Sequence, residues 1–171
     1  KKEWAPFLAP LYALAQGLFI GSISSIFDFA FAETAPNIIM NAVGLTLGVS
    51  VGMYFLYTFR IIKVTEKFRS VIIAATVGVM LFYLLVWVMR MFGMESMPFL
   101  HEGSTMGIIF SLVVVTIAAL NLLLDFDMIE KGAAMGAPKY MEWFGAFGLL
   151  VTIVWLYIEI LRLLSKVYSR D

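Results

Sequence analysis

Long runs without a charged side chain dominate the pattern of polar and hydrophobic positions. Asp, Glu, Lys and Arg are absent from residues 4–27, 34–59, 70–89 and 103–124, and a fifth apolar run covers 143–158. Each run approaches the roughly 20 residues that a helix needs to cross a bilayer. The pattern therefore predicts five membrane spans, at about residues 6–27, 37–59, 70–92, 106–124 and 140–161.

The fold class that these segments favour is an all-α, polytopic transmembrane helix bundle. Only helices and closed barrels satisfy the backbone in lipid, and the runs are continuous rather than alternating strands of about ten residues. The connections are short, so we expect consecutive spans to be antiparallel neighbours in a single transmembrane domain over residues 1–171.

Composition supports a membrane location and excludes several functions. Of the 171 residues, 62% are hydrophobic and 14% are charged, against about 45–50% and about 25% in soluble domains. The net charge is zero, which leaves no basic surface for nucleic acid. The chain has no cysteine, so thiol catalysis and disulfides are excluded. There is no Ser-His arrangement, phosphate loop or zinc-protease helix, so we expect neither an enzyme nor a bound cofactor.

The distribution of Lys and Arg predicts the orientation in a cell membrane. One side of the predicted bundle carries eight basic residues and the other side four. The richer side comprises Lys1, Lys2, Arg60, Lys63, Lys67, Arg69, Lys131 and Lys139. By the positive-inside rule, the N-terminus and the basic 60–69 segment lie on the cytoplasmic side. The alternative role for this segment is a patch that binds anionic lipid or a partner protein.

Regularly spaced glycines indicate helix packing. Gly44, Gly48 and Gly52 form a ridge on the second predicted span, and Gly17 and Gly21 repeat the spacing on the first. Small residues let helices approach closely in lipid, so we expect these positions to pack within the bundle. A homodimer contact and a pore lining are the alternatives.

Acidic side chains near the hydrocarbon are the candidates for chemistry, because a charge there is costly. Asp125 and Asp127 follow the fourth predicted span, and Glu142 begins the fifth. An antiparallel hairpin would bring Asp125 and Glu142 to similar depth, where two close carboxylates share a proton or hold a cation. With Asn121 and loop carbonyls, they offer the oxygen ligands that Ca²⁺ prefers. The pair is thus a candidate Ca²⁺ and proton-sensing site.

A simpler interpretation is that these acids lie at the membrane surface, in solvent or paired with Lys131 and Lys139. Asp127 is about 200° around a helix from Asp125, so the two do not face the same neighbour. One of them is expected to face the head groups or to pair with Lys131.

Glu159 occupies the other end of the last predicted span. It lies about 25 Å along the helix from Glu142 and therefore at the opposite membrane face. We expect Glu159 to pair with Arg162 or Arg90 there rather than to take part in transport.

Segments across nearly the whole chain resemble one family of membrane proteins. They are Ala119–Lys131 (ALNLLLDFDMIEK), Ala137–Trp143 (APKYMEW), Trp155–Leu164 (WLYIEILRLL), Pro10–Gly17 (PLYALAQG) and Val64–Phe68 (VTEKF). Together they resemble the bacterial, YccA-like branch of the transmembrane Bax inhibitor family. That resemblance implies seven helices with the last one central, two spans preceding this chain, and a pH-sensitive Ca²⁺ leak controlled by two acids on the last two helices.

The chain departs from the pattern of that family at two positions. Asp125 matches the first acid, but the second falls at about residues 150–152, where no carboxylate stands. Gln16 replaces the family's glutamate before a glycine, and an inter-helix hydrogen bond is its expected role. Glu142 lies about 12 Å along the helix from residue 150, so it would close the cytoplasmic mouth at another level.

Two functional hypotheses follow. The first is a Ca²⁺ leak with proton-dependent gating, in which Asp125 and Glu142 are the inner acids and Ca²⁺ is the permeant ion. The second is a non-conducting regulator that binds other membrane proteins, such as a membrane protease, through the glycine ridge and cytoplasmic loops. Whether the purified protein conducts ions at all distinguishes the two. Apart from the lipid bilayer, the sequence names no partner, and it leaves the oligomeric state open.

Overall fold

The computed structural model describes residues 2–93 and 104–169, and the regular structure within them is helical. A short 3-10 turn, Lys2–Trp4, leads into α1 (Ala5–Ala30), which is followed by α2 (Ile38–Thr58), α3 (Glu66–Met91), α4 (Thr105–Ala134) and α5 (Tyr140–Tyr168). All five long helices are long and apolar enough to cross a bilayer. The predicted fold class, a bundle of membrane-spanning helices, is confirmed.

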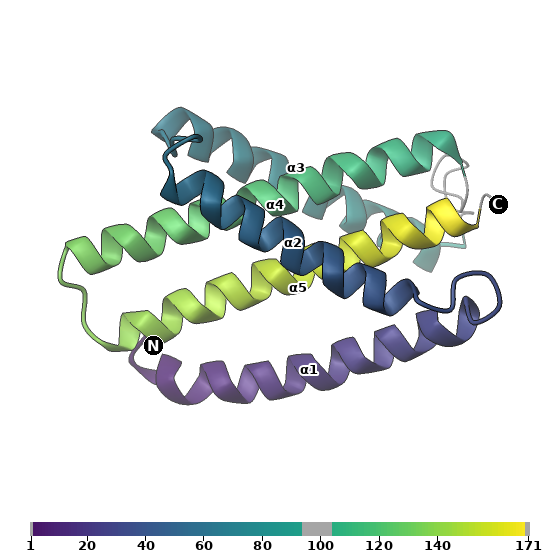
Figure 1. Cartoon of the computed structure of the whole chain (residues 1–171), viewed down its shortest axis with the longest axis horizontal. Helices are drawn as coiled ribbons and strands as arrows, with labels where there is room; N and C mark the ends of the chain where they lie inside the picture. The colour runs from purple at the N-terminus through teal and green to yellow at the C-terminus, as the bar shows by residue number, and fades with distance from the viewer. Residues whose placement is uncertain (1, 94–103, 170–171) are drawn as a thin grey trace.

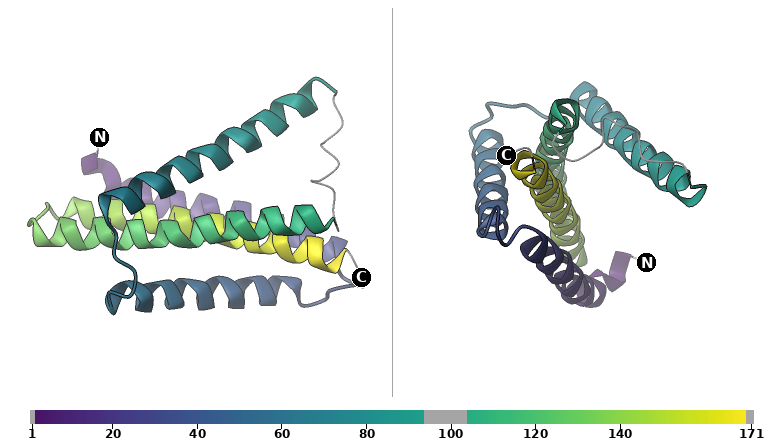
Figure 2. Two further views of the ribbon diagram at one scale, coloured as in Figure 1. Left: turned by 90° about the horizontal axis from the view of Figure 1, so that it is seen from above. Right: turned by 90° about the vertical axis from the view of Figure 1, so that its right-hand side faces the viewer.

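The last helix, α5, occupies the centre of the bundle (Figure 1). It packs on α1, α2 and α4, and its contact with α4 is the most extensive between described helices. In contrast, the backbone of α3 lies close only to that of α4 among the described helices, and Figure 2 shows α3 leaning away from the bundle. A side chain of α3, Tyr83, still reaches Glu159 on α5. The expectation that consecutive spans are neighbours is therefore wrong for α2 and α3, because α2 packs on α4 and α5 instead.

Both helices of the last hairpin are longer than the predicted spans. α4 continues to Ala134 rather than 124, and α5 continues to Tyr168 rather than 161. Charged side chains do not interrupt a helix, and an ion pair between Asp127 and Lys131, one turn apart, supports the extension of α4. Gly136 then ends the hairpin's first arm with a φ of 64°, which glycine adopts without steric cost. Asp125 consequently lies inside a continuous helix.

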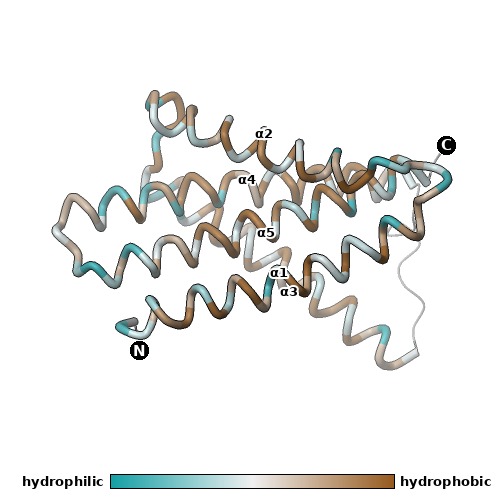
Figure 3. Tube along the Cα trace, turned by 60° about the horizontal axis from the view of Figure 1, so that its bottom comes forward, coloured by the Kyte–Doolittle hydropathy of each residue, from teal (hydrophilic) through white to brown (hydrophobic). Residues whose placement is uncertain are grey.

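The core is formed mainly by α2, α4 and α5. Leu122 and Leu123 of α4 and Leu156 and Leu161 of α5 are fully buried. Apolar side chains also cover much of the outer surface, as a chain solvated by lipid requires. Figure 3 shows hydrophobic residues along most of each helix and many of the hydrophilic ones toward the helix ends. We call the end with connections 59–65 and 135–139 the hairpin end.

Candidate functional site

Asp125 faces α5 within the extensive α4–α5 contact. Thr152 of α5 lies beside its carboxylate, within reach of a side-chain hydrogen bond, and the Thr152 hydroxyl donates to the carbonyl oxygen of Gly148 at 3.2 Å. A Cβ built on Gly148 would meet Asp125 Oδ1 at 3.8 Å, an ordinary van der Waals distance, so the acid lies directly against this part of α5. The other oxygen, Oδ2, is buried without a hydrogen-bond partner among the described residues. A buried polar atom in this state is costly and marks a functional candidate.

Thr152 stands in the interval, 150–152, where the family resemblance places a second acid. The sequence showed only that no carboxylate is present there. In the structure, a hydroxyl occupies the position and contacts the acid that is retained. The two helices therefore meet at Thr152 and Asp125.

Glu142 is not brought together with Asp125. Along the hairpin, Gly145 faces Ile129 and Gly148 faces Asp125. A Cβ built on Gly145 would lie 2.9 Å from Ile129 Cγ1. Glu142 precedes Gly148 by six positions, about 9 Å along the helix, and its side chain is exposed. It lines a separate cavity of about 130 Å³ in the hairpin turn. The predicted pair of inner acids is therefore not formed, because the register of the hairpin places them about two turns apart.

Asp127 joins α3 to α4 at the hairpin end. Its Oδ2 lies 2.6 Å from Arg69 Nη2 and 2.8 Å from Lys131 Nζ, and its side chain is 9% exposed. The expected division of roles between the two aspartates is thus observed, with Asp125 directed at α5 and Asp127 paired with Lys131. Sequence reasoning missed Arg69, because the contact depends on where α3 begins relative to α4.

A second ion pair at the hairpin end joins α4 to the end of α2. Arg60 Nη2 donates to Glu130 Oε1 at 2.6 Å, and the hydroxyl of Tyr57 donates to Glu130 Oε2. Both charged side chains are largely exposed. Glu130 was not among the predicted site residues, although it lies three positions after Asp127, on the same helix face.

Glu159 is buried in the half of α5 away from the hairpin end, with 1% of its surface exposed. Arg162 Nη1 donates to its two oxygens at 3.0 and 3.2 Å, which agrees with the predicted partner. Tyr83 of α3 donates to both oxygens at 3.2 and 3.0 Å, and Trp155 Nε1 donates at 3.3 Å. Trp155 and Arg162 are recognisable from their spacing around Glu159. Tyr83 is not, because its position depends on the tilt of α3.

A buried lysine extends this polar region toward the end of α5. Lys166 Nζ donates to the hydroxyl of Ser111 at 2.9 Å and to the carbonyl oxygen of Gly107 at 3.2 Å, both on α4. In the sequence, Lys166 stood out only as one of the four basic residues on the side of the bundle that carries fewer of them. Its burial shows that α4 and α5 are also joined by polar contacts at this end.

The neutral polar candidates have different surroundings. Asn121 of α4 donates to the hydroxyl of Thr76 on α3 at 2.8 Å and to the carbonyl oxygen of Ile117. It thus holds two helices together and does not join Asp125. Gln16 is half-buried on α1 and has no hydrogen bond with the described residues. The predicted inter-helix bond of Gln16 is not formed within the described chain.

The glycine ridges face no other described helix. A Cβ built on Gly44, Gly48, Gly52, Gly17 or Gly21 would meet nothing within 4 Å. The close approach expected there is absent from the described part of the chain, because α2 turns other residues, such as Ala42 and Met53, toward the core. The ridges are consequently open to lipid or to another molecule.

The acidic residues of the described chain do not gather into a metal site. Across residues 2–93 and 104–169, no three His, Asp or Glu side chains lie close enough to form a metal site. The expected Ca²⁺ ligands Asp125, Glu142 and Asn121 point to different neighbours: Thr152 for Asp125, the hairpin cavity for Glu142, and Thr76 for Asn121.

Comparison with known proteins identifies the family. No curated protein and no solved structure matches the chain. A family model described as Bax inhibitor 1 like matches residues 1–169, which is nearly the entire sequence. The match covers all five helices, the acid Asp125 and the Glu159 region. The chain therefore belongs to the Bax inhibitor 1-like family of membrane proteins.

Proposed function

We propose that this protein is a cation leak, with Ca²⁺ as the principal ion, and that Asp125 is the acid that makes the leak sensitive to pH. The observation that carries the proposal is the buried Oδ2 of Asp125, which has no hydrogen-bond partner among the described residues, at the contact between α4 and the central helix. Membership of a family of membrane proteins is consistent with it. An ionisable group inside a span is expensive and typically marks an ion or proton pathway.

The two protonation states of Asp125 place different demands on the helix contact. A neutral carboxylic acid costs less to bury beside Gly148 and Thr152 than a carboxylate does, because it carries no net charge that must be solvated. A carboxylate in the same place requires water or a cation for its open oxygen. Ionisation therefore favours separation of α4 and α5 and entry of a cation, so we expect the leak to increase as pH rises.

An apolar layer separates the Asp125 region from Glu159 and accounts for a closed pathway. Thr152 and Glu159 are about 10 Å apart along α5. Between them, Leu156 is fully buried and Val154 nearly so. A hydrated ion does not cross such a layer, so conduction requires displacement of α5.

Flux measurements on the whole protein test this proposal. The protein is reconstituted into liposomes, and Ca²⁺ entry is followed with an enclosed indicator between pH 5 and pH 8. We expect flux that rises with pH in the wild type and a flattened profile in Asp125→Asn. Asp28→Asn, the same change at an exposed acid on α1, is the matched control and should follow the wild type. Absence of flux, or an unchanged profile in Asp125→Asn, would contradict the proposal.

The second candidate function is a non-conducting regulator that binds other membrane proteins. The open glycine faces of α1 and α2 favour it, because a partner helix can approach closely where a Cβ would meet nothing. The liposome experiment separates the candidates. A correctly folded protein that conducts no ions at any pH would support the regulator.

We also propose that the chain is of the bacterial, YccA-like branch and that its hairpin end faces the cytoplasm. The motifs around Asp125 and Glu142 support the branch, and the excess of Lys and Arg at the hairpin end supports the orientation. The cysteine-free chain makes the orientation testable with single cysteines. Lys67→Cys should react with an impermeant maleimide only after cells are opened, and Asp28→Cys should react in intact spheroplasts. The reverse pattern would overturn the orientation.

A further inference from the structure

A groove of about 320 Å³ lies on the bundle surface at the hairpin end, between α2 and α4. Aromatic rings of Tyr54, Tyr57 and Phe126 form its walls, and Arg60 and Glu130 form its polar rim. The ring of Phe126 contacts both tyrosine rings, with its centre 5.6 Å from that of Tyr54 and 5.9 Å from that of Tyr57. The groove is thus lined by rings along one part and by charges at one end.

The groove lies at the boundary between hydrocarbon and head groups. α2 has 21 residues, a length of about 30 Å, which equals the hydrocarbon thickness of a typical bilayer. Tyr54 and Tyr57 belong to its last turns, and Arg60 follows its end. Such aromatic residues are typical of the interface. The apolar part of the groove therefore faces acyl chains, and the charged rim faces the head groups.

Arg60 adopts a backbone conformation that non-glycine residues rarely adopt. Its φ is 57°, in the left-handed region. This conformation turns the chain away from the axis of α2, and the turn is stabilised by the amide of Ile61, which donates to the carbonyl oxygen of Leu56 at 3.0 Å. The guanidinium lies 5.8 Å from the centre of the Tyr57 ring and pairs with Glu130. Arg60 is thereby kept at the rim, and the basic connection to α3 begins beside the groove.

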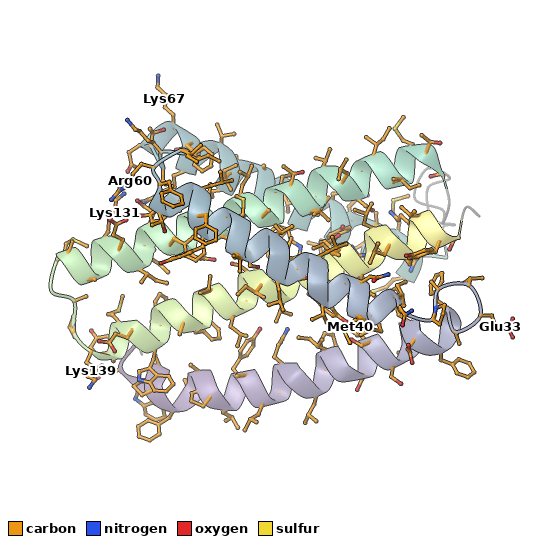
Figure 4. All side chains as sticks on the ribbon, viewed as in Figure 1. Glu33, Met40, Arg60, Lys67, Lys131 and Lys139 are labelled. Atoms are coloured by element: carbon orange, nitrogen blue, oxygen red, sulfur yellow. The ribbon has the colours of Figure 1, made fainter. Side chains whose placement is uncertain are left out.

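The hairpin end carries more positive charge than its ion pairs neutralise. Arg60 is paired with Glu130, and Arg69 and Lys131 share Asp127. Lys63 and Lys67 are exposed and form no ion pair within residues 2–93 and 104–169. Figure 4 shows Arg60, Lys67 and Lys131 at one corner of the bundle and Lys139 at another. Two lysines without an ion pair among the described residues thus follow the charged rim of the groove closely along the chain.

We propose that this corner is a binding site for an anionic phospholipid. One acyl chain lies in the groove against Tyr54 and Phe126, and the phosphate of the head group is held by Lys63 and Lys67. Clusters of Lys and Arg at a membrane surface attract anionic lipids, and the attraction falls off within a Debye length. The aromatic groove, which continues from the charges into the hydrocarbon, favours a lipid over an acidic protein or a free phosphate compound.

Competition between two lipids tests the site. Purified protein in detergent is mixed with equal amounts of dioleoyl phosphatidylglycerol and dioleoyl phosphatidylcholine, and bound lipid is measured by native mass spectrometry. We expect preference for phosphatidylglycerol, and a loss of about fivefold in that preference for Lys63→Gln and for Lys67→Gln. Lys139→Gln removes an exposed lysine outside the corner and should leave the preference unchanged. An equal loss in Lys139→Gln would show general surface attraction and overturn the proposal.

The groove is tested separately from the charges. Thr58→Trp, at the groove wall, should fill it and reduce binding of both lipids at least severalfold while both lysines remain. Unchanged binding in this variant would overturn the placement of the acyl chain. Soluble glycerol 1-phosphate should not displace the lipid, and equal displacement by it would indicate a free phosphate site. Absence of any preference for phosphatidylglycerol would also overturn the proposal and would favour an acidic protein as the partner of the basic corner.

Discussion

Thr152 on α5 lies beside the carboxylate of Asp125 on α4, within reach of a side-chain hydrogen bond. This contact lies within the most extensive helix pair of the described chain, and the acid also lies against Gly148. Position 152 therefore offers a way to change the surroundings of Asp125 without altering the acid itself.

Thr152→Asp should move the pH dependence of Ca²⁺ flux. It would place two carboxylates within hydrogen-bonding reach, and because both do not ionise cheaply, the pair keeps one proton to higher pH. We expect the midpoint of flux against pH to rise by about 1 unit or more in liposomes. Thr152→Ser retains the hydroxyl and should match the wild type. An unchanged midpoint in Thr152→Asp would argue against Asp125 as the controlling acid.

Loss of Arg162 should be more damaging than loss of the charge on Glu159. Arg162→Met leaves a carboxylate with 1% exposure dependent on Tyr83 and Trp155, and breaking a buried ion pair costs about 3–5 kcal/mol. Glu159→Gln leaves a cation whose side chain is 38% exposed and can reach solvent. Thermal unfolding in detergent, followed by tryptophan fluorescence, should rank Arg162→Met below Glu159→Gln. Equal midpoints would mean that the Glu159 region is hydrated.

The Arg69–Asp127 ion pair should be stronger than the Arg60–Glu130 pair. Asp127 is 9% exposed, whereas both partners of the second pair are largely exposed. A double-mutant cycle with Arg69→Gln and Asp127→Asn should give a coupling free energy of about 1–3 kcal/mol. The matched cycle with Arg60→Gln and Glu130→Gln should give about 0.2–1 kcal/mol. Unfolding in mixed detergents provides both values, and the opposite order would refute the ranking.

The open glycine ridge predicts tolerance to a large side chain. Gly48→Leu should leave the thermal midpoint of the purified protein unchanged, because a Cβ at Gly48 meets nothing within 4 Å. Gly145→Leu is the control, since its Cβ would lie 2.9 Å from Ile129 Cγ1, and overpacking costs about 1–3 kcal/mol. A marked loss of stability in Gly48→Leu would show that the ridge is already covered by another copy of the chain or by a helix partner.

Much of the site region was predictable because its cause is local. The positions of Asp127 and Lys131, one turn apart, indicate their ion pair, and Glu159 and Arg162 are related in the same way. The angular separation of Asp125 and Asp127 likewise follows from helix geometry. In contrast, whether Asp125 meets Glu142 depends on how far α4 and α5 are shifted along one another. A short connection between the helices leaves that shift open by several residues.

The amino-acid sequence by itself determined that the chain forms five apolar helices, because a backbone in lipid has to satisfy its own hydrogen bonds and charge-free runs mark where this happens. It also identified Asp125 and the family resemblance. Only the tertiary structure decided that Asp125 meets Thr152, that Tyr83 reaches Glu159, and that the glycine ridge is open. These relationships depend on register, tilt and rotation of neighbouring helices, and in lipid those are decided by side-chain packing across the whole bundle rather than by hydrophobic pattern.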